Sequence, residues 1–151
     1  MEKEQQTVSE KKESQSSESL KQVETILYNE ENTIKWQLNS EEVANFGNKN
    51  FIDLMDLNID VIDIKEKAAS MLYSFTAPAG KYYNNKNILS LKRPIKIEKD
   101  SYLLTAGNMQ WRQKENTVKG DKGVKITTPS LVLTGSEFIS NLKIDSITVS
   151  G

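Results

Sequence analysis

Short runs in which apolar and polar residues alternate dominate the chain from Gln22 onward. Successive side chains of a β-strand point to opposite faces, so this period of two predicts half-buried strands. Glycine, asparagine, aspartate and lysine pairs separate the runs and predict turns. Pro78, Pro94 and Pro129 fall between such runs, where a missing N–H breaks no central ladder. Two short segments, 40–46 and 66–72, are also compatible with helix, but the pattern as a whole predicts an all-β domain. The clearest runs are 33–38, 89–91, 95–97, 102–106, 124–126 and 131–133.

A weak internal repeat with an offset of 29 residues links several of these runs. It aligns the segment Tyr73–Thr76 with Tyr102–Thr105 and with Leu131–Thr134, and it aligns Ile95–Ile97 with Val124–Ile126. Each unit has one apolar face that it cannot bury alone. Stacked units would therefore build a continuous apolar trough.

The first 21 residues differ in composition from the rest of the chain. They hold four lysines and five glutamates, and Met1, Val8 and Leu20 are their apolar residues. So little apolar surface does not offset the entropy of ordering a chain. We expect residues 1–21 to form a flexible, disordered polar tether, and residues 22–151 to form one folded domain.

The absence of cysteine and histidine restricts the chemistry that the chain can perform. It removes disulfides, thiolate nucleophiles, imidazole bases and the usual zinc ligands. We therefore expect no enzymatic activity, no cofactor and no metal. No stretch has the roughly 20 consecutive apolar residues that a membrane-spanning helix needs.

The segment Asp56–Asp60 imitates the opening of a calcium-binding loop, because oxygen-bearing side chains alternate in it. Val61 stands where the turn glycine is required, and Lys67 stands where the closing glutamate is required. The segment is better explained as the outward polar positions of a strand. The apolar residues of 59–64 change parity after Val61, which predicts a β-bulge there.

Charge is distributed unevenly, although the formal net charge is only −1. Residues 22–80 contain ten acidic and four basic side chains, whereas residues 81–125 contain four acidic and eleven basic ones. The basic side chains either bind phosphates or an acidic partner, or they keep exposed strands from aggregating, and the sequence leaves both open. They include Lys92, Arg93, Lys96, Lys99, Arg112, Lys114, Lys119, Lys122 and Lys125.

Nucleic acid does not fit this basic segment. Tyr102 and Trp111 share the alternation of Leu104 and Met109, so they belong to the apolar face and do not interleave with the lysines. We expect no nucleic-acid binding.

A longer pattern resembles the periplasmic domain of the LptC family of lipopolysaccharide-transport proteins. The resemblance spans about Glu24 to Gly151. The segment 36–44 resembles the opening strand of that family's domain. Its remaining motifs are Gly80-x-Tyr82, Leu89-x-Leu91-x-x-Pro94-Ile95-x-Ile97, Leu103-x-Thr105 with Trp111, Val118-x-Gly120-Asp121-x-x-Val124-x-Ile126 and Leu131-x-Leu133-x-Gly135.

The resemblance implies an open β-jellyroll of two packed antiparallel sheets that carries lipopolysaccharide acyl chains in an apolar groove. It also implies periplasmic localisation, with an N-terminal inner-membrane anchor that we expect to be absent from this sequence. The implied partners are the permease subunits of an ABC transporter and an LptA-type bridge protein, and edge pairing would also allow homo-oligomers. The inward positions that we expect to line the groove, or the core beneath it, are Phe75, Leu91, Ile97, Leu104, Met109, Trp111, Ile126, Leu133 and Phe138.

Two runs have few of the defences that protect an edge strand from pairing with another chain. The run 33–38 and the run 144–149 contain no proline and one charged residue each. We therefore expect them to be the two docking edges, with Ile34 and Trp36 in the first and Ile144, Ile147 and Val149 in the second. Two alternatives remain: an extracytoplasmic β-sandwich that binds carbohydrate or protein, and a β-solenoid.

Overall fold

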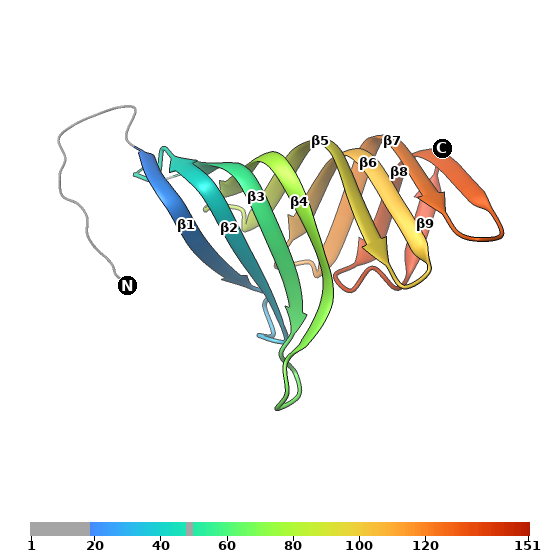
Figure 1. Ribbon diagram of the computed structural model, residues 1–151, viewed down its shortest axis with the longest axis horizontal. Coiled ribbons are helices and arrows are strands. Elements are labelled where there is room, and N and C mark those ends of the chain that lie inside the picture. Colours follow the sequence, from blue (N-terminus) through green and yellow to red (C-terminus); the bar gives the residue numbers. More distant parts are fainter. Residues whose placement is uncertain (1–18, 48–49) are drawn as a thin grey trace.

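The computed structural model describes residues 19–47 and 50–151. Nine antiparallel strands form one continuous sheet, in which each strand pairs with its neighbours in the sequence (Figure 1). No helix occurs among the described residues. The all-β prediction is thus confirmed. The strands are β1 (Ser19–Tyr28), β2 (Ile34–Ala44), β3 (Phe51–Asp63), β4 (Ser70–Tyr83), β5 (Ile88–Lys99), β6 (Tyr102–Arg112), β7 (Thr117–Thr127), β8 (Val132–Asn141) and β9 (Ile147–Ser150).

The sheet bends into two layers and does not close into a barrel. β1 and β9 are its two edges, and they lie toward opposite ends of the long axis in Figure 1. The layer β1–β4 contacts the layer β5–β9 through side chains that are distant in the sequence. For example, the Trp111 indole N–H donates to the Tyr73 hydroxyl at 3.2 Å. The two packed layers of the predicted open jellyroll are therefore two halves of one sheet.

The two layers are joined by backbone pairing over only part of their length. β4 and β5 pair from Ala79–Lys92 to Tyr83–Ile88 and diverge beyond that, as Figure 1 shows. Pro78 and Pro94 lie where this pairing stops, inside β4 and β5 respectively. The prediction that both prolines lie between strands is therefore wrong. Each strand keeps its other neighbour, and a proline is tolerated beside a gap because the ladder there needs no N–H donor.

The core lies between the layers and receives side chains from strands β2 to β8. Alternate residues of β2, from Ile34 to Ser40, are buried, as the period of two predicts. The register shifts between Val61 and Ile62, which confirms the predicted bulge. Similar shifts follow one another across β5, β6, β7 and β8, and bulges of this kind increase the local twist and bend of a sheet.

The predicted tether lies mostly outside the described residues. Its last three residues, 19–21, belong to β1, where Leu20 pairs with Val43 and Lys21 with Glu42. The Lys21 ammonium lies 3.0 Å from the Glu42 carboxylate and holds the pKa of that carboxyl below its usual range. The sheet thus begins three residues before Gln22.

Candidate functional site

The interior between the layers contains almost all of the residues that were predicted to line an apolar groove. Eight of the nine are buried in the core: Phe75, Leu91, Ile97, Leu104, Met109, Trp111, Ile126 and Phe138. Leu133 pairs with Ile126 and so shares its face of the sheet, yet it is 48% exposed. It lies near the β7–β8 turn, where Leu131 and Val132 are also exposed.

An aromatic cluster joins the two layers in the middle of this interior. The rings of Phe75 and Trp111 stack with centroids 5.1 Å apart, and Phe75 also stacks on Tyr73 at 6.1 Å. The Tyr73 hydroxyl accepts from Trp111 and donates to the Leu142 carbonyl at 2.8 Å. Burial raises the pKa of Tyr73 well above its ordinary value, so this hydroxyl stays protonated and keeps donating.

The β8–β9 loop closes the interior on the side where β4 and β5 diverge. Leu142 and Ile144 are buried, although both belong to a turn and not to a strand. The Tyr102 hydroxyl, at the start of β6, donates to the Ile144 carbonyl. Ile144 was predicted to lie in the C-terminal edge strand as a docking residue. Its side chain instead points into the core, because the chain turns at Asn141 and β9 begins only at Ile147.

The N-terminal edge is β1 and not the run that contains Ile34 and Trp36. That run belongs to β2, which is paired on both sides, by β1 and by β3. Ile34 and Trp36 are buried in the core and have no access to a partner. Within residues 19–47 and 50–151, the free edge instead belongs to β1, whose Leu20, Ile26 and Tyr28 are exposed.

The C-terminal edge is the short strand β9. Ile147 pairs with Ser140 and Val149 pairs with Phe138, and both apolar side chains are partly buried against the core. Among the described residues no further strand pairs with β9. The structure thus places Ile147 and Val149 on an edge strand, as the sequence predicted, with their side chains directed toward the core.

Polar side chains tie the layers together at one end. The Gln113 amide donates to the Tyr28 carbonyl at 2.6 Å and accepts from the Tyr82 hydroxyl at 2.7 Å. Nearby, the buried Asn29 amide donates to the Asn116 side chain at 3.2 Å. The turn after β1 is thereby fixed to the β6–β7 turn. No local pattern predicts this contact, because the partners are 85 and 87 residues apart in the sequence.

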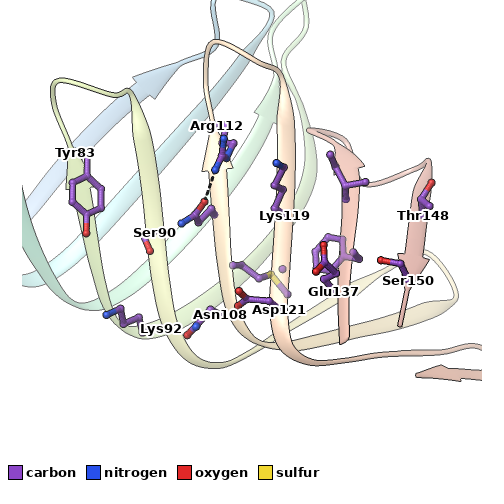
Figure 2. A pocket seen from close by; sticks show the side chains of 15 residues that line it. Tyr83, Ser90, Lys92, Asn108, Arg112, Lys119, Asp121, Glu137, Thr148 and Ser150 are labelled. Atoms are coloured by element: carbon purple, nitrogen blue, oxygen red, sulfur yellow. Dashed lines mark hydrogen bonds between the residues drawn. The ribbon is translucent and has the colours of Figure 1, made fainter. Parts of the chain in front are cut away.

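The outer face of the second layer carries a polar depression of about 630 Å³ (Figure 2). One cross-strand row in it contains Lys92, Asn108, Asp121, Glu137 and Ser150, each paired with the next. Arg112 and Lys119 also line it, and Arg112 donates to Gln110 at 3.2 Å. The floor is therefore polar and carries both cations and carboxylates.

The described residues contain no group of three or more histidines, cysteines, aspartates and glutamates that could hold a metal ion. They also contain no helix that is long and apolar enough to cross a membrane. The features that do stand out are an apolar interior, a gap between β4 and β5, and two free edges.

The family described as "Lipopolysaccharide-assembly, LptC-related" matches residues 1–151. The chain belongs to this family. Its role is lipopolysaccharide transport, and LptC-related proteins are periplasmic, associate with the inner membrane and work with the lipopolysaccharide transporter. No curated protein matches the chain.

Three groups of residues in this LptC-related chain were not predicted from the sequence. They are the exposed apolar residues of β1, the polar residues that join the layers, and the buried pair Leu142 and Ile144. The 29-residue repeat indicated part of the last group, because it aligns the two tyrosines that hold Leu142 and Ile144. Tyr73 and Tyr102 are equivalent in it, and both hydroxyls donate to carbonyls of the same loop.

Proposed function

We propose that this LptC-related chain holds the acyl chains of lipopolysaccharide between its two layers and passes them sideways toward the outer membrane. The observation that carries the proposal is the combination of an apolar interior with a gap between β4 and β5. An acyl chain that enters such an interior loses contact with water, which stabilises the complex by about 25 cal/mol per Å² of buried apolar surface. Release through the gap breaks no β4–β5 backbone hydrogen bond, since those strands do not pair there.

The two free edges join this chain to its neighbours in the transport path. β1 adds to a periplasmic sheet of the ABC transporter's permease subunits, and β9 adds to an LptA-type bridge protein. Strand addition satisfies unpaired backbone N–H and C=O groups and so gives affinity without a deep pocket. The exposed Leu20, Ile26 and Tyr28 of β1 support a partner at that edge, because apolar side chains gain from being covered. An N-terminal anchor keeps the domain at the inner membrane.

The basic second layer suits the phosphates of the lipid headgroup. Lys96 of β5 and Lys125 of β7 both pair with Thr105 of β6, so the two cations lie in one cross-strand row. Both lysines are exposed. Such cations make charge-assisted hydrogen bonds to phosphate oxygens while the acyl chains occupy the interior.

Site-specific photocrosslinking in cells tests the acyl-chain site. A photoreactive residue in place of Phe75 or Leu104, both buried between the layers, should crosslink to lipopolysaccharide. The matched control is Gln110, which lies on the opposite face of β6 and lines the outer depression. Crosslinks from Gln110 alone, in a folded protein, would contradict the proposal.

The outer depression supports a second candidate function, a β-sandwich that binds carbohydrate. Asn108, Gln110 and Ser90 offer amides and a hydroxyl, and Tyr83 offers an aromatic ring at the rim. Sugars that lack acyl chains should then bind, and an Asn108→Ala/Gln110→Ala variant should lose them. If that variant keeps lipopolysaccharide crosslinking from Phe75 and the wild type binds no such sugar, the carbohydrate function is excluded.

A further inference from the structure

We infer that the β8–β9 loop is a plug, and that an unbranched acyl chain binds by displacing Leu142 and Ile144 from the interior. This inference rests on the proposed function and names the place where the acyl chain enters.

The loop lies across the gap between the two layers and is fixed to both. The first layer holds it through the Tyr73 hydroxyl, which donates to the Leu142 carbonyl at 2.8 Å. The second layer holds it through the Tyr102 hydroxyl, which donates to the Ile144 carbonyl. The Lys143 ammonium adds an ion pair with Asp63, at the end of β3, at 3.4 Å. These polar contacts hold the loop, which does not take part in the backbone pairing of the sheet.

The side chains that the loop inserts are aliphatic and fully enclosed. Leu142 is 2% exposed and Ile144 is 0% exposed, whereas Asp145 and Ser146 face water. Connecting loops normally run over the surface, so two buried aliphatic side chains in a five-residue turn call for an explanation. A methylene chain has the same apolar chemistry as these side chains and can fill the same space.

The backbone of the loop is strained at Ile144. Ile144 has a φ of 54°, in the left-handed region that β-branched residues avoid. Such a conformation persists only where the surroundings impose it, and the Asn141 turn and the Tyr102 hydrogen bond impose it here. Displacement of the loop releases this strain, which offsets part of the cost of uncovering the interior.

The surrounding strands leave this side free to open. β4 and β5 share no backbone pairing beyond Ala79 and Lys92, so separation of the loop disrupts no ladder between them. Beside the loop, Gln113 bonds to Tyr28 and Asn29 bonds to Asn116, and Thr117, next to Asn116, pairs with Asn141, where the loop begins. The domain should therefore open by displacement of the β8–β9 loop, while these neighbouring contacts hold the turn after β1 to the β6–β7 turn.

A reversible tether on the loop tests the inference directly. The chain has no cysteine, so a Lys143→Cys/Asp63→Cys variant carries a single reactive pair, which a bis-maleimide with a cleavable disulfide spacer can join. The matched control is Lys21→Cys/Glu42→Cys, which replaces the ion pair between β1 and β2. The probe is cis-parinaric acid, a fluorescent unbranched fatty acid, titrated before joining, after joining and after reduction.

The tethered loop should weaken binding of the fatty acid by at least about tenfold, and reduction should restore it, because a plug that cannot leave keeps its site filled. The joined control should bind as well as the untreated protein. Equal binding by the tethered and the released Lys143→Cys/Asp63→Cys protein would overturn the plug while leaving the proposed function intact.

Removal of the two hydroxyls gives the opposite test. A Tyr73→Phe/Tyr102→Phe variant loosens the loop and should bind the fatty acid several-fold more tightly than the wild type. A nitroxide on Lys143→Cys should become more mobile when the fatty acid is added, which reports the loop itself. If neither the wild type nor the double phenylalanine variant binds the probe, acyl-chain holding is wrong and the plug falls with it.

Discussion

The ring of Phe75 in β4 stacks on the indole of Trp111 in β6, with an angle of 14° between their planes. This contact connects the two layers at the centre of the interior, where no backbone pairing links β4 to β6. Stacked aromatic pairs contribute about 0.5–1.5 kcal/mol beyond the area that they bury. The contact helps hold the layers together on the side where β4 and β5 diverge.

A charge should be tolerated at Leu133 and not at Leu104, although both were predicted to face inward. Leu104 is 0% exposed, so a Leu104→Lys variant places an unpaired charge in the core and should lose several kcal/mol of stability. The matched Leu133→Lys variant should change stability by no more than about 0.5 kcal/mol, because that side chain is 48% exposed. Urea unfolding measures both. Equal losses would mean that Leu133 is covered in solution.

The two tryptophans should respond differently to replacement by phenylalanine. Both are fully buried, but the Trp111 indole donates to Tyr73, whereas the Trp36 indole nitrogen has no hydrogen-bond partner. Trp111→Phe should therefore cost about 1 kcal/mol more unfolding free energy than Trp36→Phe, since only the former removes a hydrogen bond. Chemical denaturation of the two variants, compared with the wild type, measures the difference. A larger loss for Trp36→Phe would show that its indole is paired in solution.

Alkaline pH should destabilise the fold through Tyr102. Burial of the phenol, with nearby Asp100 and Asp145 adding to the effect, raises the pKa of Tyr102 from 10.0 to about 12. Because the folded-state pKa is the higher one, the stabilisation is complete below pH 10 and disappears as the pH rises through about 12. The unfolding free energy of the wild type should fall across this window, and that of Tyr102→Phe should fall less. Parallel curves for the two proteins would assign the alkaline loss to other groups.

Proline substitutions in β9 should weaken assembly with the downstream bridge protein. Ile147 and Thr148 pair with Ser140 and Ile139, and backbone N–H groups of an edge strand alternate between the sheet and the free side. One of the variants Ile147→Pro and Thr148→Pro removes the backbone N–H that points away from β8. That variant should stay folded and lose binding to an LptA-type partner in a pull-down. The other should lose pairing within the sheet. Undiminished binding by both variants, in folded protein, would exclude β9 as the docking strand.

The sequence alone predicted the class of fold and most of the core. Alternation is a local property, since one strand's own residues decide which of them share a face, so Tyr102 could be grouped with Leu104, and Met109 with Trp111, without any partner. The register shift between Thr105 and Asn108 directs both pairs to the interior. The bulge after Val61 was predicted for the same reason, because neighbouring residues show that the apolar positions change from odd to even numbers there. The motifs of the β-strands also supported the family, which the match over the whole chain confirms.

The tertiary structure decided what lies beside each strand and what covers it. Ile34 and Trp36 carry no local sign that β1 pairs outside them, and β1 itself alternates weakly because an edge strand buries little. Ile144 continues an apolar run and looks like part of a strand, yet a turn at Asn141 directs it into the core. Leu133 shares the face of the buried Ile126, yet it is 48% exposed. Edges, gaps and plugs depend on contacts between distant segments, and a local pattern does not encode those contacts.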